Sequence, residues 1–368
     1  MRDSLAREET IMDEQARHSR LERRRLIRLG MPLLGLAVAG GLLAREAGRP
    51  HARAQRLTQG SAMQALTLAT AAPQDDPALL AAHDQDIFAR YHMVVAMAPG
   101  VTSGRAAIEA IRSGRADGAI APVLAWLPAL QDGLDARLVC GLRAGNSRLL
   151  IRRHAPMHRI EDLYRHAIGT ANPDPDDPDR LFFSIMMRRK GMHPDRDVTW
   201  RVFHEATLGA ALAQGHVQAI IGHDPAIWRL GESLGFDQLA SSQTGSYAIR
   251  VSRVLGVRGA MLRDSPGVVL AISQAMQEAV VWAARHPPRI SQLLAAQENG
   301  LTQPEAARML HAEGGPVHPV GPNLRNQIAQ YMDELKLLGL TPEASDSSGL
   351  AKRFTANVRA LGSVGRSG

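Results

Sequence analysis

A strand–helix alternation that occurs twice along the chain limits the possible folds more than any other feature of this sequence. The first series has three short apolar strands, predicted over residues 65–69, 92–97 and 118–121. The second series has three more, predicted over residues 167–170, 197–203 and 218–221. Helices are expected between the strands, from Pro77 and Ser103 in the first series and over 180–190 and 207–214 in the second. Such an order builds a parallel sheet covered by helices, so we expect an α/β protein with two similar lobes.

Two apolar segments between the series predict strands over 137–141 and 148–151, near a point where the chain crosses from one lobe to the other. One further strand is expected at 254–258, and the sequence after it has helical periodicity. Thr302 and Glu305 form a capping-box pattern at the start of one of these helices. A set of C-terminal helices is therefore expected after the second series.

Residues 1–54 have the composition of an export signal, with 11 arginines and 7 acidic residues. The basic stretch Arg23–Arg28 precedes an apolar run of 16 residues, Leu29–Ala44. A membrane-spanning helix needs about 20 apolar residues, and this run also contains proline and glycine. The small-x-small site Ala52–Ala54 follows, so we expect export with cleavage near Ala54. The order of Arg23–Arg28 resembles a twin-arginine signal, while a membrane anchor or a basic tail is the alternative.

The composition excludes several classes of protein. Of the formal net charge of +7, the front of the chain supplies more than half, and aromatic residues make up only 4%. A nearly balanced body with so few aromatic residues does not indicate nucleic-acid binding. The single cysteine, Cys140, excludes an internal disulfide and lies inside an apolar strand, where a reactive thiolate is disfavoured. The 14 histidines show no metal-ligand spacing, and no nucleotide-binding or nucleophile motif occurs.

Four motifs in the same order resemble those of a known family. They are Asp76–Ala81 with Ile87–Met93, then Gly191–Val198, then Leu212–Ala219, and finally Val254–Arg258 followed by Ser265 and Pro266. Each is similar to the corresponding phrase of the periplasmic solute-binding proteins of ABC importers for nitrate, bicarbonate, sulfonates and taurine. The similarity extends from about residue 65 to residue 355.

This resemblance implies the type II periplasmic-binding fold, with two α/β lobes, crossing strands, a ligand cleft between the lobes and C-terminal helices. Lobe 1 would comprise residues 55–150 with 246–368, and lobe 2 residues 151–245. The protein would be a non-enzymatic periplasmic monomer that captures a small anion without metal or cofactor, with a permease and its ATPase as partners. An anion sensor, or an enzyme similar to thiamine-pyrimidine synthases with His223 as its reactive histidine, is the alternative.

Helix N-termini offer free amides and a positive dipole end, which suits the capture of an anion. Three such places are candidates for ligand contact if the lobes face one another. Their residues are Thr102, Ser103 and Gly104 at the first, Thr170 and Asn172 at the second, and Thr207 at the third. At each place, ordinary helix capping or a plain connecting loop is the alternative interpretation.

Five further residues complete the predicted site. Trp126 could form an apolar wall, and Ser147 lies beside the crossing strand. The resemblance implies the other three: Asp224 keeps a carboxylate of the family pattern, Tyr247 stands at an aromatic position, and Arg250 replaces a missing lysine. An arginine fork suits a planar oxyanion or carboxylate. Because of these departures from the family pattern, the sequence does not decide between nitrate, a sulfonate and another organic anion as the ligand.

An acidic, proline-interrupted segment precedes the helix expected at 180–190. Its carboxylates are Asp174, Asp176, Asp177 and Asp179. The spacing lacks the central glycine of a calcium-binding EF-hand loop, so we interpret the segment as a stiff solvated loop, with cation binding left open. Because these charges would repel an anion, we expect them at the rim of the cleft or outside it.

Overall fold

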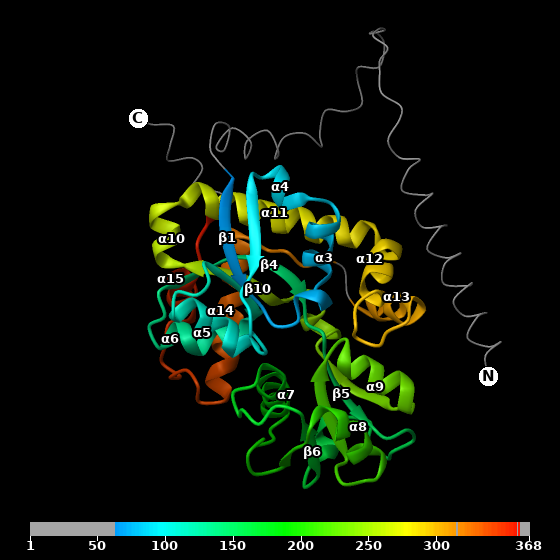
Figure 1. Ribbon diagram of the computed structural model, residues 1–368. Coiled ribbons are helices and arrows are strands. Elements are labelled where there is room, and N and C mark those ends of the chain that lie inside the picture. Colours follow the sequence, from blue (N-terminus) through cyan, green and yellow to red (C-terminus); the bar gives the residue numbers. More distant parts are fainter. Residues whose placement is uncertain (1–62, 314–315, 359, 361–368) are drawn as a thin grey trace, which may run out of the picture. The chain divides into compact units, whose positions relative to one another are not determined.

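The computed structural model describes residues 63–313, 316–358 and 360. The export signal predicted over residues 1–54 and the tail after residue 360 lie outside the described residues. The described chain is an α/β protein with two five-stranded sheets (Figure 1). In Figure 1 the green segments carry the second sheet, and the yellow to red segments return to the first. The prediction of two similar α/β layers is confirmed.

The first sheet has the strand order β2-β1-β3-β10-β4. Its strands are β1 (Gln64–Ala69), β2 (Met93–Met97), β3 (Gly118–Pro122), β4 (Ala136–Ala144) and β10 (Val251–Arg258). β1 runs parallel to β2 and β3, whereas β10 runs antiparallel to β3 and β4. Most strand residues are buried on both faces, which explains their continuous apolar sequence.

The second sheet repeats this arrangement with the order β7-β6-β8-β5-β9. Its strands are β5 (Ser147–Ile151), β6 (Ala167–Thr170), β7 (Thr199–Val202), β8 (Ala219–His223) and β9 (Asp237–Ser241). β6 is parallel to β7 and β8, and β5 is antiparallel to β8 and β9. The chain therefore crosses between the sheets twice, from β4 to β5 and from β9 to β10, and β5 spans the expected lobe boundary at residue 151.

Helices connect the strands of each sheet. The first sheet has α3 (Pro77–Asp84), α4 (Ile87–Arg90), α5 (Gly104–Arg112) and α6 (Val123–Gln131), and the second has α7 (Pro178–Arg189), α8 (Glu205–Ala213) and α9 (Ala226–Leu234). Short 3-10 turns lie at Pro73–Asp75, Ile160–Leu163 and Gly245–Tyr247. The predicted helix at 207–214 begins two residues earlier, because His204 rather than Thr207 is its N-cap.

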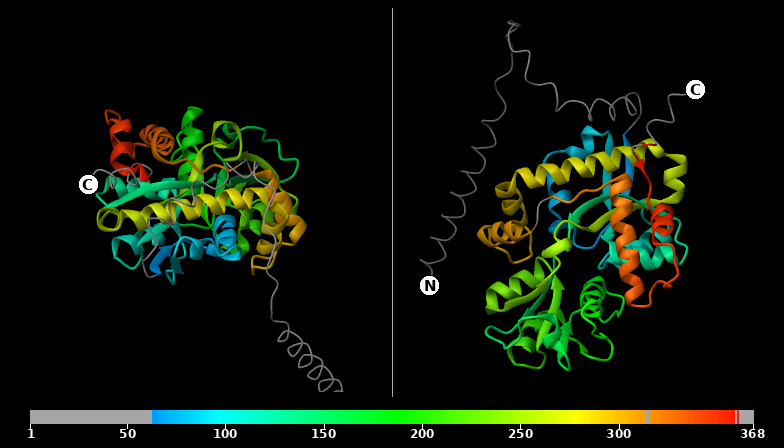
Figure 2. Two further views of the ribbon diagram at one scale, coloured as in Figure 1. Left: turned by 90° about the horizontal axis from the view of Figure 1, so that it is seen from above. Right: turned by 180° about the vertical axis from the view of Figure 1, so that it is seen from behind.

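In the described part of the chain after β10, the structure has six helices. They are α10 (Gly259–Asp264), α11 (Pro266–Arg285), α12 (Pro287–Ala295), α13 (Gln303–Ala312), α14 (Gly321–Leu337) and α15 (Ser347–Phe354). The capping box of Thr302 and Glu305 is confirmed at the start of α13. Figure 2 shows α14, in orange, beside the first sheet with one end near α7.

The helix α11 packs in the core of the first sheet. Among the described residues it alone is long and apolar enough to cross a membrane by length and composition. Its side chains Val269, Ile272 and Met276 are fully buried against apolar residues of β1, β4 and α3. Burial of this kind is typical of a core helix, so its composition is explained by packing within the protein.

Candidate functional site

A cavity of about 140 Å³ lies where segments from both sheets and α14 meet, and we call it the cleft pocket. Its lining comprises Ala71, Thr102–Gly104, Ile120, Pro122–Leu124, Gly145–Ser147, Asn172, Asp177–Asp179, Phe182, His223, Ser242, Tyr247, Ser252, Arg253 and Tyr331. Most of these residues stand at strand ends, helix starts or the two crossings. In an α/β protein such positions are the usual location of a ligand site.

One wall of the cleft pocket is the start of α5. Ser103 caps this helix, because its hydroxyl accepts a hydrogen bond from the Ala106 amide at 3.1 Å. A side chain at Gly104 would come within 3.0 Å of Pro122, so glycine allows the helix to begin against the end of β3. The amides of Gly104 and Arg105 have no hydrogen-bond partner among the described residues. This helix start can therefore donate to an anion.

The opposite sheet contributes the start of α7, where the structure corrects one expectation. Asp177 and Asp179 are buried and line the cleft pocket instead of lying at its rim or outside. Asp177 is the N-cap of α7, since its carboxylate accepts hydrogen bonds from the Asp179 and Arg180 amides at 3.1 and 3.3 Å. Asn172 donates to the same carboxylate at 2.7 Å. Capping therefore requires this acid at the helix start, and the helix start faces the pocket.

Asp179 links the start of β5 to the end of β8 through a pair of hydrogen bonds. Its Oδ1 accepts from the Ser147 hydroxyl at 2.5 Å, and its Oδ2 lies 2.7 Å from Nδ1 of His223. The Asp179 charge raises the pKa of His223 to about 9, against the opposing effect of burial. The imidazole is therefore protonated at neutral pH, and Nδ1–H donates to Asp179. The His223 side chain is 64% exposed, which leaves its second N–H available to a ligand.

The pKa values of the two carboxylates at the start of α7 shift in opposite directions. Burial alone would raise the pKa of Asp179, but the His223 charge and the hydrogen bonds from His223 and Ser147 lower it. Burial and the neighbouring Asp179 charge raise the pKa of Asp177 to about 6. Asp179 and His223 thus form a neutral ion pair, and Asp177 carries the remaining negative charge of this wall.

Arg253 of β10 brings a second cation to the cleft pocket. Its Nε lies 3.1 Å from Oδ2 of Asp76, and one terminal nitrogen donates to the Thr70 hydroxyl and the Ala71 carbonyl at 2.6 and 3.2 Å. These contacts fix the guanidinium at the end of β1, so the pocket holds one constrained arginine and one exposed imidazolium.

Several residues of the predicted site come together in the cleft pocket. They are Thr102, Ser103, Gly104, Ser147, Asn172 and Tyr247. Tyr247 contributes its ring, which packs edge to face on Phe182 with centroids 4.9 Å apart. The remaining predicted residues lie elsewhere.

Trp126 and Thr170 have structural positions outside the pocket lining. Trp126 is fully buried in α6, and a side chain at Gly256 of β10 would lie 2.6 Å from its ring, so the tryptophan packs where that glycine leaves room. Thr170 is buried at the end of β6, where its hydroxyl accepts from the Asn172 amide at 3.2 Å. It shapes the turn that leads to α7.

Thr207 and Asp224 also lie outside the lining. Thr207 is exposed in the first turn of α8 and donates to the His204 carbonyl at 2.9 Å. Asp224 is buried and accepts from Nε of Arg148 at 2.9 Å, with Gln243 as a further donor. The Asp224 carboxylate is therefore paired with Arg148 and has little hydrogen-bonding capacity left for a ligand.

Arg250 is the clearest departure from the predicted site, because its charge is neutralised inside the protein. It is buried and donates to Oε1 of Glu334 at 2.6 Å. Its guanidinium also lies over the rings of Tyr247 and Tyr331, 4.7 and 5.2 Å from their centroids. Since Glu334 belongs to α14, the sequence near Arg250 contains no sign of this partner.

Metal binding finds no support in the part of the chain that the structure describes. There, no group of three or more histidine, cysteine, aspartate or glutamate side chains is placed to hold a metal ion. Asp174 instead pairs with Arg105 at 2.6 Å. Cys140 is buried in β4, and burial raises the pKa of its thiol to about 12.

Comparison with known proteins identifies the family. The model of the NMT1-like family matches residues 59–296, which is more than half of the chain. This chain belongs to the NMT1-like family. No curated protein matches it.

Solved structures similar to this NMT1-like protein include periplasmic binding proteins. The sulphonate-binding protein SsuA of Escherichia coli covers 80% of this chain and 98% of its own, at 17% identity and a TM-score of 0.65. SsuA of Xanthomonas axonopodis, bound to MOPS, covers 80% and 98% at 18% identity and a TM-score of 0.63. The nitrate-binding protein NrtA of Synechocystis covers 83% and 90% at 14% identity and a TM-score of 0.62. The chain therefore has the periplasmic-binding fold, and the resemblance drawn from the sequence is confirmed.

Sequence reasoning missed the charged residues of this NMT1-like protein's pocket. His223 was considered only as the reactive histidine of an enzyme, and Arg253 and Asp179 were not assigned to the site. One signal was available for His223, because it ends an apolar strand, and strand ends in an α/β protein point to the ligand site. Arg253 lies within a strand and is recognised only from the structure.

Proposed function

We propose that this protein captures a small anion in the cleft pocket and delivers it to the permease and ATPase of an ABC importer. The observation that carries the proposal is His223, whose imidazolium is held by Asp179 and lines the same pocket as the unpartnered Gly104 amide. An imidazolium and a helix N-terminus are both donors that favour negative charge.

The buried acids leave one uncompensated negative charge in the wall of the cleft pocket. Asp179 is balanced by His223, and both of its oxygens already accept hydrogen bonds. Asp177 is held by Asn172 and by amides of α7. With Arg253 counted against its partner Asp76, the pocket wall keeps one negative charge at Asp177, distributed over three donors. A ligand anion would then be placed toward His223 and α5.

The size of the cleft pocket favours a small ligand. Pockets for drug-sized molecules measure about 300–1,000 Å³, whereas this cavity has about 140 Å³. Two of the similar structures are named as a sulphonate-binding and a nitrate-binding protein, and both kinds of ligand carry a small oxyanion. In this proposal the lobes are residues 55–150 with 246–368 and residues 151–245, and they close on the anion as hinged bodies.

The site is proposed to bind without catalysis. The Ser147 hydroxyl donates to Asp179 and makes no hydrogen bond with His223 among the described residues, so His223 is not placed to deprotonate it. Cys140 is buried in the first sheet, and its thiol has a pKa of about 12. Capture in the periplasm, after removal of a twin-arginine-like signal near Ala54, is part of the same proposal.

A ligand scan by thermal unfolding tests the proposal. Nitrate, bicarbonate, taurine and short alkanesulfonates would each be added to the exported protein. We expect one of them to raise the melting temperature, because a ligand at 100 times its Kd stabilises the folded state by about 2.7 kcal/mol. Unchanged melting curves with all of these anions would contradict anion capture.

The scan has an internal control in the protein itself. Lys336→Ala removes a half-buried cation on α14 whose ion pair with the exposed Asp333, at 3.0 Å, lies within one turn of that helix and which does not line the cleft pocket. It should leave the ligand-induced shift unchanged, whereas Ser103→Asp, which places a carboxylate at the start of α5, should remove most of it. N-terminal sequencing of the exported protein tests cleavage near Ala54 independently of binding.

A further inference from the structure

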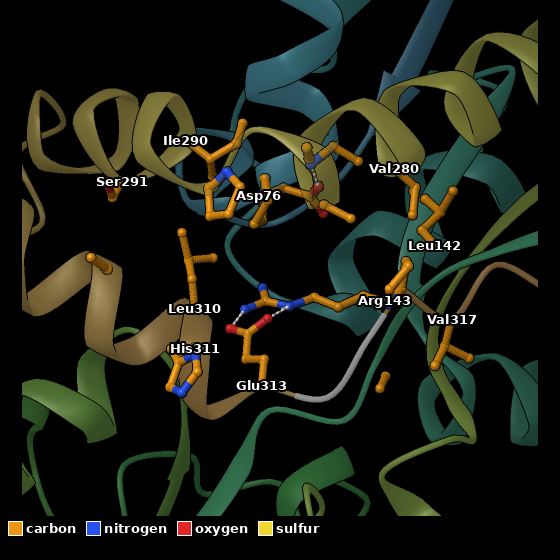
Figure 3. A pocket seen from close by; sticks show the side chains of 18 of the residues that line it. Asp76, Leu142, Arg143, Val280, Ile290, Ser291, Leu310, His311, Glu313 and Val317 are labelled. Carbon is orange, nitrogen blue, oxygen red and sulfur yellow. Dashed lines mark hydrogen bonds and ion pairs between the residues drawn. The ribbon is translucent and has the colours of Figure 1, made fainter.

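A second cavity, of about 680 Å³, lies beside the first sheet and is much larger than the cleft pocket (Figure 3). We call it the α13 pocket. It is bounded by the start of α3, the end of β4, α11, α12 and α13. Apolar side chains form most of its wall, among them Val280, Ile290, Leu310 and Val317. This volume is in the range of about 300–1,000 Å³ that organic ligands occupy.

The wall of the α13 pocket contains one ion pair, between Arg143 and Glu313. Nε of Arg143 donates to Glu313 Oε2 at 2.9 Å, and a second guanidinium nitrogen donates to Oε1, so the pairing is bidentate. Figure 3 shows both side chains pointing toward each other in the middle of the pocket. Their side chains are 15% and 12% exposed. A planar carboxylate on an arginine fork is the arrangement by which proteins also recognise a ligand acid.

Glu313 and Arg143 are held by different kinds of element. It is the C-cap of α13 and therefore lies just outside the regular helix. Arg143, by contrast, is fixed within β4, whose pairing with β10 includes this residue. The Arg143 guanidinium is thus held by the first sheet, whereas the carboxylate paired with it belongs to Glu313 at the end of α13.

The charges around the fork are balanced only while Glu313 occupies it. Three arginines, Arg148 buried and Arg143 and Arg253 half-buried, each pair with one acid: Arg143 with Glu313, Arg148 with Asp224, and Arg253 with Asp76. Departure of Glu313 toward solvent would leave one uncompensated positive charge in this cluster. An entering anion would restore the balance, whereas a cation would not.

We propose that the α13 pocket binds an organic acid with an apolar body, whose carboxylate or sulfonate takes the place of Glu313 on Arg143. The exchange keeps the number of ion pairs and charge-assisted hydrogen bonds constant. Burial of the apolar body against Val280, Ile290 and Leu310 then supplies the favourable free energy. The α13 pocket adjoins the cleft pocket at Gly145, which lines both, and the ion pair of Asp76 with Arg253 joins the two linings.

Calorimetric titration of the full chain with decanoate tests this proposal. We expect saturable binding at one equivalent, and binding at least about tenfold tighter in Glu313→Gln, because the neutral amide competes less well for the fork. Decanol, which lacks the charge, should bind equally to both proteins. Decanoate that binds neither protein, or equally to both, would overturn the proposal.

Two further variants locate the acid. Arg143→Met with Glu313→Gln removes the fork without leaving an unpaired buried charge, and it should weaken decanoate binding at least about tenfold relative to Glu313→Gln. Ala284→Trp fills the pocket from its exposed edge and should remove binding. If both variants bind as tightly as Glu313→Gln while circular dichroism shows them folded, the acid binds elsewhere and the proposal is wrong. Decanesulfonate in the same series distinguishes the two acid classes.

Discussion

At the scale of single residues, one imidazole determines the positive charge that the cleft pocket can offer. His223 is protonated at neutral pH only because Asp179 lies 2.7 Å from its ring. Asp179 in turn keeps its charge because His223 and Ser147 donate to it. The three side chains come from β8, α7 and β5, so their meeting depends on the whole second sheet.

The raised pKa of His223 predicts how stability depends on pH. A folded-state value of about 9, against an ordinary value of 6.5, means that the folded protein binds this proton more tightly. The stabilisation is fully present below pH 6.5, declines as the pH rises, and is absent above about pH 9. We expect wild type to lose more thermal stability between pH 6 and pH 9.5 than His223→Gln does, as measured by circular dichroism.

A second histidine provides the control for this measurement. His158 is exposed in the loop before Ile160 and belongs to the same sheet's lobe. His158→Gln should keep the pH dependence of wild type. Equal pH dependence in wild type and His223→Gln would show that the Asp179 charge does not hold the proton on His223.

The same residues show what the sequence could and could not predict about the site. Ser103 and Gly104, which line the cleft pocket, were predicted from a helix start, which is a local pattern, and Asn172 from its place after a strand. Arg250 was assigned to the ligand because it replaces a lysine of the family pattern, yet its partner Glu334 lies 84 residues further along the chain. Partners brought together by tertiary folding leave no local sequence signal, so the charge balance of buried groups was not predictable.

At the scale of elements, the helix α5 combines a cap that stabilises it with the proposed anion contact, and both involve Ser103. Ser103 caps α5, and replacement of such a cap by alanine costs about 1 kcal/mol. Aspartate and asparagine cap as well as serine does, but aspartate also places a negative charge at the helix start. We expect Ser103→Asp and Ser103→Asn to unfold at similar urea concentrations, and only Ser103→Asp to lose anion binding.

The outcome separates two roles of Ser103. If Ser103→Asn also loses binding, the hydroxyl itself contacts the ligand. Unimpaired anion binding in Ser103→Asp would mean that the anion does not approach α5 at all. Ser103→Ala, which removes the cap while adding no charge, measures how much of any loss follows from fraying of the helix.

The elements themselves were largely predictable, and the exceptions have physical reasons. Apolar strands such as β3 and β8 are buried, and their continuous apolar sequences predict this burial. β9 (Asp237–Ser241) was missed because it is an edge strand whose first residues, Asp237 and Gln238, are exposed and polar. α6 was missed because Pro128 lies within it, which disfavours a helix in local sequence reasoning.

At the scale of the whole molecule, the described contacts between the two sheets' lobes combine apolar packing with ion pairs, since one cluster of buried apolar side chains contains Trp126 of α6 and Phe183 of α7. Arg105 of α5 pairs with Asp174 before α7 at 2.6 Å, and Arg189 of α7 pairs with Glu334 of α14 at the same distance. Phe182 and Tyr247 add an aromatic contact. Polar contacts of this kind can form and break without exposing a large apolar surface, which suits the hinged closure that we propose.

The pair of Arg105 and Asp174 allows closure to be tested apart from folding. Arg105 is 75% exposed, so the pair contributes at most about 1 kcal/mol. If this pair forms only when the lobes close, Arg105→Ala should leave the urea midpoint of unfolding nearly unchanged. It should weaken binding of the anion found in the scan by up to about fivefold, because 1.4 kcal/mol corresponds to tenfold. A double-mutant cycle with Asp174→Asn should then show coupling in the binding free energy and none in the free energy of unfolding.

Arg112→Ala is the matched control, since Arg112 lies on the same helix and pairs with Glu109 within it at 3.5 Å. A coupling of equal size in unfolding and in binding would show that the pair is permanent, and closure would then depend on other contacts.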